Sequence, residues 1–157
     1  MPTVLNISAA AVLGLHAMAL LTAHPEGRLS AREMAQSLSA SEAHLAKVMQ
    51  RLVHVGLVHS VRGPGGGFRL AKAAGDIRLV EVYEAIEGPL GESACLMEMP
   101  VCSAEHCILG GLLRTVNRQV KDYLEKTRLS DLEIIRELAG GACGDATRTQ
   151  RPERVTR

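Results

Sequence analysis

Hydrophobic residues fill almost every position of the first predicted element, from Ser8 to Ala23. A stretch without a polar face predicts a helix that is buried on most sides. Breaker residues at positions 24–27 end it. No Lys or Arg precedes the stretch, His16 interrupts it, and it is shorter than the roughly 20 apolar residues of a membrane span. We therefore expect the first helix of a cytoplasmic protein with no membrane partner, rather than a signal peptide.

The next pattern predicts two short helices joined by a polar turn. Ser30–Glu33 has the sequence of a capping box, in which a serine and a glutamate satisfy free amides at a helix start, and this helix extends to about Leu38. Between Glu42 and Val55, apolar residues recur at helical spacing until Gly56 ends the second helix. These residues are Leu45, Val48, Met49 and Leu52. Such a pair forms a helix-turn-helix, whose second helix enters the major groove of DNA.

A β-hairpin is predicted directly after this pair. Leu57–Val61 has the composition of a strand, Arg62–Gly67 forms a tight glycine-rich turn, and Phe68–Leu70 returns as a second strand. A hairpin in this place is the wing of a winged helix-turn-helix. Arg62 stands at its tip, where glycines let the backbone approach a sugar–phosphate surface, so we expect this arginine to enter a minor groove. An exposed hairpin with an incidental arginine is the alternative.

The second half of the chain is again mostly helical. Helices are predicted at Asp76–Glu87, at Ile108–Lys126 and from Ser130 to about Leu138, the last opened by a second capping box, whereas Gly91–Cys107 has no period and is interpreted as a loop. The helix at 108–126 carries a larger apolar stripe than a small domain needs, so we expect it to pack on the same helix of a partner chain. The stripe consists of Leu109, Leu112, Leu113, Val116, Val120 and Leu124.

These elements define the predicted fold and its organisation. We expect a mainly α protein: a winged helix-turn-helix with a short β-hairpin wing and a long C-terminal dimerisation helix. Residues 1–75 form the DNA-binding domain, whose first helix also packs on the dimerisation region. Residues 76–139 carry the cysteine loop and the dimerisation helices. Residues 140–157, rich in Gly, Thr and Arg, form a disordered tail.

The net charge of +1 conceals an uneven distribution along the chain. Residues 24–78 contain eight Lys/Arg and four Asp/Glu, whereas residues 79–137 contain six and eleven. The basic segment is the candidate for phosphate contact. Phe68, Tyr83 and Tyr123 are the only aromatic residues, so stacking platforms for single-stranded nucleic acid are scarce. The expected partner is double-stranded DNA with a palindromic operator.

The residues expected to contact DNA lie at the start of the second helix of the pair and at the tip of the wing. The first turn of that helix faces the base edges, and its next exposed cations, Lys47 and Arg51, also reach phosphates. The full set is Ser41, Glu42, Ala43, His44, Lys47, Arg51, Arg62, Gly63 and Gly65.

Cys95, Cys102 and Cys107 form the candidate chemical site. Cytoplasmic thiols stay reduced, so three in one short stretch favour metal or redox chemistry over a disulfide framework. Thiolates suit iron–sulfur clusters and zinc. An enzyme is not expected: Gly63–Gly67 lacks the Lys and Ser/Thr that complete a phosphate-binding loop, and no pocket of paired carboxylates or Cys–His arrangement is apparent. Cys143 is interpreted as a free thiol, with a resolving role in thiol oxidation as the alternative.

The run GLVHSVRGPGGGFRL at residues 56–70 resembles the wing of the IscR/NsrR/RirA-type regulators, the Rrf2 family. The resemblance extends over about residues 6–135, including Pro89 and the cysteine loop. It implies a homodimeric winged-helix transcription factor with a long dimerisation helix and, in many members, an iron–sulfur cluster held by three cysteines. A [2Fe-2S] cluster is the expected cofactor, with [4Fe-4S] as the alternative.

Two departures from these regulators concern the ligands. Six residues separate Cys95 from Cys102 and four separate Cys102 from Cys107, which displaces the middle cysteine by one position from its common place. Gly110 occupies the position where IscR-like members have a histidine ligand. Other members take the fourth ligand from the first helix of the partner, which points to His16. A packed core histidine is the alternative reading of His16, and Glu105 or a labile small molecule could fill the position instead; the neighbouring His106 is expected to point elsewhere.

The expected function is therefore a homodimeric transcriptional regulator that senses cluster status, redox state or nitric oxide. In this hypothesis the cluster holds the cysteine loop and sets the spacing of two reading helices to half-sites about 34 Å apart. The first alternative is a cluster-free regulator that responds through thiol oxidation, a metabolite or a protein partner. The second is a zinc-organised interaction module without a regulatory role on DNA.

Overall fold

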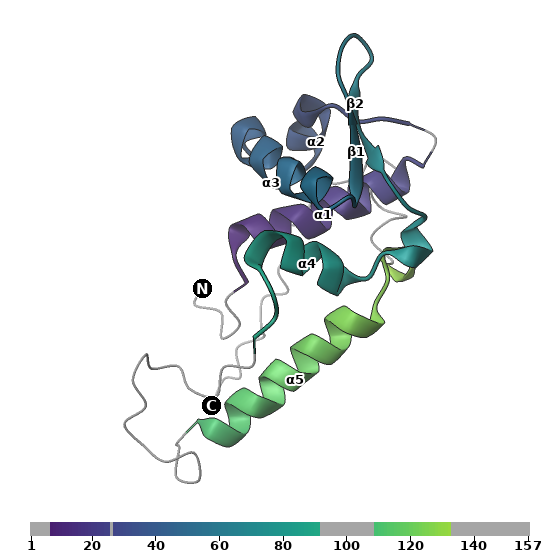
Figure 1. Cartoon of the computed structure of the whole chain (residues 1–157). Coiled ribbons are helices and arrows are strands. Elements are labelled where there is room, and N and C mark those ends of the chain that lie inside the picture. The colour runs from purple at the N-terminus through teal and green to yellow at the C-terminus, as the bar shows by residue number, and fades with distance from the viewer. Residues whose placement is uncertain (1–6, 26, 92–108, 133–157) are drawn as a thin grey trace, which may run out of the picture.

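The structure is a computed structural model that describes residues 7–25, 27–91 and 109–132. In chain order it contains α1 (Ala9–Ala23), α2 (Ala31–Ser37), α3 (Glu42–His54), β1 (Val58–Val61), β2 (Gly67–Leu70), α4 (Leu79–Glu87) and α5 (Gly110–Lys126) (Figure 1). Short 3-10 turns occupy Ala74–Asp76 and Leu129–Asp131. The predicted fold class, a mainly α winged helix-turn-helix with a hairpin wing and a long helix after it, is confirmed. The predicted domain boundaries stay a prediction.

Helix α1 is the centre of the core, as its nearly continuous apolar sequence predicts. It packs against both α3 and α4, and in Figure 1 it crosses the molecule between them. Met18 of α1, Met34 of α2 and Met49 of α3 are fully buried in one cluster. Methionine fills irregular gaps well, which suits a core with few aromatic residues. Helix α3, the predicted reading helix, is thus held from behind by α1.

Serine side chains begin the first three helices. The hydroxyl of Ser8 caps α1, and the hydroxyl of Ser41 caps α3. At α2 the predicted capping box is confirmed: the Glu33 backbone N–H donates to Ser30 Oγ at 3.2 Å, and the Ser30 backbone N–H donates to Glu33 Oε2 at 2.8 Å. Each cap satisfies an amide that has no partner within its own helix. The starts of these helices were therefore readable from the sequence.

Acid is expected to weaken the start of α2 through Glu33. Hydrogen bonds from the Ser30 hydroxyl and backbone N–H hold the pKa of this carboxyl below its ordinary value of 4.5. Because the folded pKa is the lower one, the contribution of Glu33 to stability is present above the unfolded pKa and is lost as the pH falls through the folded pKa. Melting temperatures measured by circular dichroism between about pH 3 and pH 7 should fall less steeply with acid in Glu33→Gln than in the wild type. Identical pH profiles would contradict this role.

The hairpin forms as predicted and has an additional partner. Strands β1 and β2 are antiparallel, with Val58 opposite Leu70 and Ser60 opposite Phe68. Leu29, from the loop before α2, forms a further antiparallel bridge with Phe68. The Phe68 N–H donates to the Leu29 carbonyl at 2.8 Å, and the Leu29 N–H donates back at 3.1 Å. This bridge, which the sequence did not predict, attaches the wing to the helix-turn-helix.

The helix predicted from Asp76 begins later in the structure, at Leu79. Ile77 and Arg78 are extended instead, and residues 77–79 pair with residues 127–129: the Leu129 N–H donates to the Ile77 carbonyl and the Leu79 N–H to the Thr127 carbonyl, both at 3.0 Å. Long-range hydrogen bonding and the burial of Ile77 therefore override local helical preference here.

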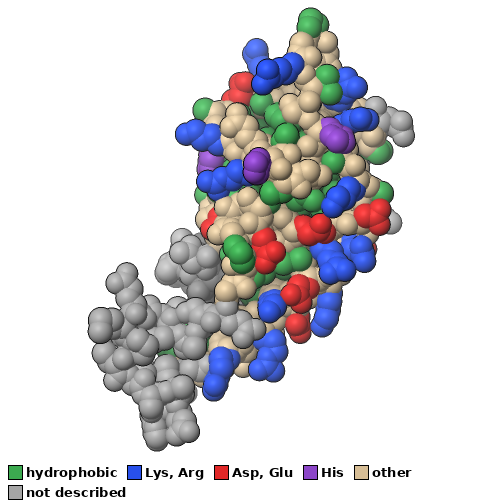
Figure 2. All heavy atoms as spheres, viewed as in Figure 1, with side chains coloured by type: hydrophobic (Ala, Val, Ile, Leu, Met, Phe, Trp, Pro, Cys, Tyr) green, Lys and Arg blue, Asp and Glu red, His purple; other side chains and the backbone are tan. Residues whose placement is uncertain are grey.

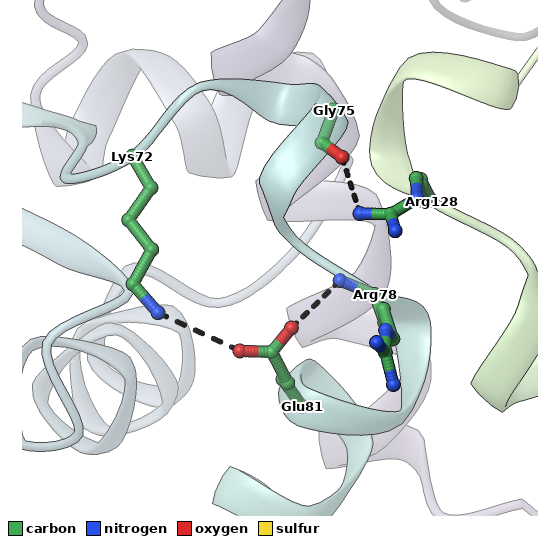
Figure 3. Close-up of polar contacts among 5 residues, drawn as sticks. All are labelled: Lys72, Gly75, Arg78, Glu81 and Arg128. Atoms are coloured by element: carbon green, nitrogen blue, oxygen red, sulfur yellow. Dashed lines mark hydrogen bonds and ion pairs between the residues drawn. The ribbon is translucent and has the colours of Figure 1, made fainter.

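Polar contacts reinforce this junction between α4 and the end of α5 (Figure 3). Glu81 accepts from the Arg78 backbone N–H at 2.9 Å and lies 3.6 Å from Lys72 Nζ. Arg128 Nη1 donates to the Gly75 carbonyl at 2.5 Å. The Arg128 contact ties the chain after α5 to the turn before α4, and the Glu81 contacts hold the start of α4.

The structure does not place Ser130 at the start of a helix, where the predicted capping box requires it. Ser130 lies inside the 3-10 turn Leu129–Asp131, and Asp131 accepts from the Arg128 backbone N–H at 2.9 Å. The start of this turn is set by the pairing at residues 77–79 described above. The rest of the predicted final helix and the predicted disordered tail lie outside the described residues.

Helix α5 leaves the body of the protein and contacts it mainly through α4 (Figure 1). Of its predicted apolar stripe only Leu124 is buried, whereas Leu109 is 46% and Leu112 is 59% exposed. A groove of about 460 Å³ runs along its inner side, with α1 on the opposite wall. In the described segments, no helix combines the length and hydrophobicity that crossing a membrane requires.

Candidate nucleic-acid interface and cysteine segment

The start of α3 presents the predicted reading residues to solvent. Its apolar side, which includes Leu45 and Met49, is buried against α1 and α2, so the opposite side faces outward. All five reading residues are exposed on this part of the helix: Ser41, Glu42, Ala43, His44 and Lys47. The hydroxyl of Ser41 accepts the His44 backbone N–H at 3.5 Å. The structure therefore brings these predicted residues together on one accessible surface.

Arg51, the last predicted DNA contact of α3, has a partner within the protein. Its side chain is largely exposed, but Nη1 donates to the Ile86 carbonyl in the last turn of α4 at 2.7 Å. A guanidinium beside the carboxyl end of a helix also interacts favourably with the helix dipole. Arg51 thus joins the reading helix to the end of α4, a contact that the sequence pattern did not indicate.

The wing places Arg62 and its glycines at an exposed tip. Gly63 and Gly65 have φ values of 99° and 72°, in the left-handed region that glycine adopts readily. The Gly66 N–H closes the turn by donating to the Gly63 carbonyl at 2.8 Å. A side chain at Gly66 would lie 2.3 Å from the Val61 carbonyl oxygen, so this position excludes every other residue without rearrangement. Glycine here permits the tight turn that carries Arg62.

Basic side chains surround the hairpin on the face shown in Figure 2, whereas most acidic side chains on this face lie below it. This distribution agrees with the charge asymmetry of the sequence. Two exposed arginines, Arg69 in β2 of the wing and Arg28 in the loop before α2, were not among the predicted contacts. Both line a hollow beside Gly65. The sequence showed their charge but not their proximity, which depends on the bridge between Leu29 and Phe68.

His16 lies on the surface of α1, with its ring exposed on the wall of the groove that faces α5. Its Nδ1 lies 2.8 Å from the Val12 carbonyl oxygen. Because a carbonyl only accepts hydrogen bonds, this contact requires the proton on Nδ1 and leaves Nε2 with its lone pair. The exposure of the ring argues against the alternative of a packed core histidine.

The three cysteines lie at 95, 102 and 107, outside the described residues, as do Glu105, His106 and Cys143. Their ligand role stays a prediction. Within the described segments, no three His, Cys, Asp or Glu side chains are grouped as a metal site would need. The structure does describe the two ends of this segment, because α4 ends at Glu87 before it and α5 begins at Gly110 after it.

Comparison with known proteins places the whole fold in one family. The family model Rrf2, described as an iron-dependent transcriptional regulator, matches residues 7–133. The chain is 36% identical to the putative HTH-type transcriptional regulator BadM of Rhodopseudomonas palustris over 83 residues, which are 53% of each chain, so it spans about half the length of that relative. It is 31% identical to the HTH-type transcriptional regulator IscR of Erwinia tasmaniensis over 107 residues, which cover 68% of this chain and 65% of that one.

A solved structure agrees with this assignment. CymR (YrzC), the global cysteine regulator of B. subtilis, superposes with a TM-score of 0.66 at 27% identity, covering 87% of this chain and 97% of that one. The winged helix-turn-helix and the helix that follows it are thus shared with a known regulator. The chain belongs to the Rrf2 family of transcriptional regulators.

Proposed function

We propose that the protein is a homodimeric DNA-binding regulator that senses the state of an iron–sulfur cluster held by Cys95, Cys102 and Cys107. One observation carries the proposal. These thiols occupy the segment between α4 and α5 of a winged helix-turn-helix chain, and the chain belongs to a family described as iron-dependent regulators. A DNA-reading unit and a soft-metal donor set therefore share one small protein.

DNA binding is proposed to use the α3 face and the wing together. The exposed first turn of α3, including Glu42 and His44, fits the major groove, which admits an α-helix. Lys47 lies one turn further along the exposed side, where it can reach a phosphate. Arg62, with Gly63 and Gly65, fits the adjacent minor groove, where narrow stretches concentrate negative potential.

A homodimer is supported by the exposed apolar side of α5. Leu112 and Tyr123 are each 59% exposed, and the groove between α5 and α1 is lined mainly by apolar side chains. Burying such a surface against a second copy removes it from water. Two copies related by a two-fold axis would read a palindromic operator.

The three cysteine thiolates suit a cluster, but the sequence beside them lacks the histidine that serves as a fourth ligand in IscR-like members. Thiolates are the soft ligands that the irons of an iron–sulfur cluster prefer. The cluster, when bound, would make the protein sensitive to oxidation and to loss of iron. His16 is proposed as the fourth ligand, contributed to the partner's cysteines. In its support, the ring is exposed beside α5, and its Nε2 remains free for coordination while Nδ1 faces the Val12 carbonyl. As predicted from the sequence, [2Fe-2S] is the preferred type.

Contacts at the end of α4 provide a route from the cysteine segment to the reading helix. Arg51 of α3 donates to the Ile86 carbonyl, and Ser8 before α1 donates to the Glu87 carboxylate. The Leu90 N–H, past the end of the helix, donates to Glu84 Oε1 at 3.0 Å. A displacement of the chain after Leu90 is therefore proposed to alter the placement of α3.

Anaerobic purification tests the proposed cofactor and its ligands. The wild type is expected to be brown, with visible absorption and equal amounts of iron and acid-labile sulfide. Cys102→Ala should lose the colour, and His16→Ala should retain a less stable cluster with a shifted spectrum. Cys143→Ala is the matched control because it removes a thiol from outside the trio. Operator binding should differ between the metal-loaded and metal-free wild type.

Two results would overturn this proposal. A colourless wild type without iron or sulfide would exclude the cluster, and equal operator affinity with and without metal would exclude its role as a signal. The likeness to the global cysteine regulator favours one second candidate in that case, a cluster-free regulator that responds to a metabolite or to thiol oxidation. If His16→Ala matches the wild type in colour, spectrum and stability, the fourth ligand lies elsewhere.

A further inference from the structure

Three basic residues lie in a row across the outer face of the wing. His59 of β1 is opposite Arg69 of β2 in the hairpin register. On the other side of β2, Leu29 forms an isolated antiparallel bridge with Phe68, so its neighbour Arg28 comes beside Arg69, and the two line one hollow. Directly opposed residues of antiparallel segments project to the same face. All three basic residues are exposed, so this face carries a band of donors.

The two arginines of this row frame a hollow. Its volume is about 420 Å³, and Arg28, Arg69 and Gly65 are among its lining residues. Within the described residues, neither arginine side chain takes part in a hydrogen bond or an ion pair. Like charges directly opposed across a sheet are destabilising on their own. An anion between them removes this repulsion and accepts hydrogen bonds from both guanidinium groups.

The position of this hollow indicates that the anion is a phosphate of bound DNA. Helix α3 contacts β1, whereas Arg28 lies beyond β2, so the hollow is on the side of the wing opposite the reading helix. In Figure 1 the loop that leads to α2 starts on that side of the hairpin and then crosses it to reach α2. Two strands border any minor groove. If the tip of the wing enters the groove, the strand away from α3 runs along this side.

We propose that Arg28 and Arg69 form a clamp for DNA phosphates on the strand of the minor groove that lies away from α3. The proposal rests on the proposed entry of the wing into the minor groove. It extends the protein's contact from the groove itself to the far sugar–phosphate backbone. The clamp carries affinity without base readout, because phosphate contacts are independent of sequence.

The test is the salt dependence of DNA binding. Binding of the full-length protein to a fluorescent mixed-sequence duplex of about 30 base pairs is measured over a range of KCl concentrations. Each lost phosphate contact reduces the slope of log K against log salt by about 0.9. Arg28→Gln with Arg69→Gln should therefore lower the slope by about 2 for each bound chain. The double change to Lys should retain most of the slope, since lysine also neutralises a phosphate.

The matched control is Arg78→Gln with Lys126→Gln, which removes two exposed cations, one directly before α4 and one in the last turn of α5; both helices lie below the wing in Figure 1. Its slope should equal that of the wild type, and thermal melts should show that every variant is folded. A slope for the Arg28/Arg69 variant that equals the control would overturn the clamp. Arg62→Ala separates the two proposals. If Arg62→Ala weakens binding and the Arg28/Arg69 variant does not, the wing enters the minor groove but the clamp is wrong. If Arg62→Ala has no effect on binding, the proposed entry of the wing into the minor groove is wrong.

Discussion

Gly67→Ala is expected to destabilise the protein by about 2–3 kcal/mol and to weaken DNA binding at the same time. A Cβ atom at Gly67 would lie 2.7 Å from the Leu29 carbonyl oxygen and 2.8 Å from its carbonyl carbon. These are backbone atoms, which cannot move aside as the end of a flexible side chain can. The φ of Gly67 is 151°, which is unfavourable for residues with a side chain.

The bridge between the wing and the loop before α2 explains why this change is expected to affect the proposed DNA interface. Both hydrogen bonds of the bridge join Leu29 to Phe68, the residue after Gly67. Separating the two segments breaks these bonds, frees the hairpin to tilt and moves Arg28 away from Arg69. The affinity for duplex DNA should therefore fall by more than the loss of folded protein accounts for.

Urea denaturation and fluorescence anisotropy on the same samples measure the two effects. Gly65→Ala is the matched control for stability, because Gly65 also has a positive φ, 72°, but a Cβ atom there would have no neighbour within 4 Å. It should cost about 1 kcal/mol from backbone strain alone. If both variants lose the same stability, the contact with Leu29 has no special role in holding the wing.

Local chemistry explains which parts of the fold the sequence predicts. Ser30 and Glu33 form their capping box from residues that are close along the chain, and Gly56 follows the end of α3 with a φ of 75°. By contrast, the start of α4 depends on pairing with residues 127–129 at the far end of α5. A pattern that counts apolar residues over 76–87 cannot include that partner, so it placed the helix start too early.

The same distinction between local and long-range causes applies to the candidate site. The exposed face of α3 and the wing tip follow from periodicity and from glycine spacing, so the exposed positions of Lys47 and Arg62 could be predicted, whereas their contact with DNA stays a prediction. The second role of Arg51 could not, because its partner is a carbonyl of Ile86 in a distant helix. The proximity of Arg28 to Arg69 depends on the long-range bridge between Leu29 and Phe68, which composition does not reveal. The cysteine trio was found by residue type and spacing alone, and its ligand role stays a prediction.

Gly14→Ala is expected to destabilise the protein by about 2 kcal/mol, although alanine is the better helix former. Gly14 is buried in α1 where that helix meets α3 and α4. A Cβ atom there would lie 2.1 Å from Ile86 Cδ1 and 3.3 Å from Val48 Cγ1. The close packing of α1 on α4 therefore depends on the missing side chain. Displacing Ile86 also disturbs the last turn of α4, to which Arg51 is bonded.

A double-mutant cycle with Ile86→Val tests this cause, because that substitution deletes the Cδ1 methyl group that the new Cβ would meet. Ile86→Val alone should cost about 1 kcal/mol. Adding Gly14→Ala to it should then cost little or even stabilise, since the helical preference of alanine, worth up to about 1 kcal/mol, is no longer offset by the clash. Gly111→Ala in α5, where a Cβ atom would meet nothing within 4 Å, measures the effect of the same substitution without a neighbour. If urea denaturation shows that the Gly14 and Ile86 effects are additive, Ile86 is not the reason that α1 requires glycine at this position.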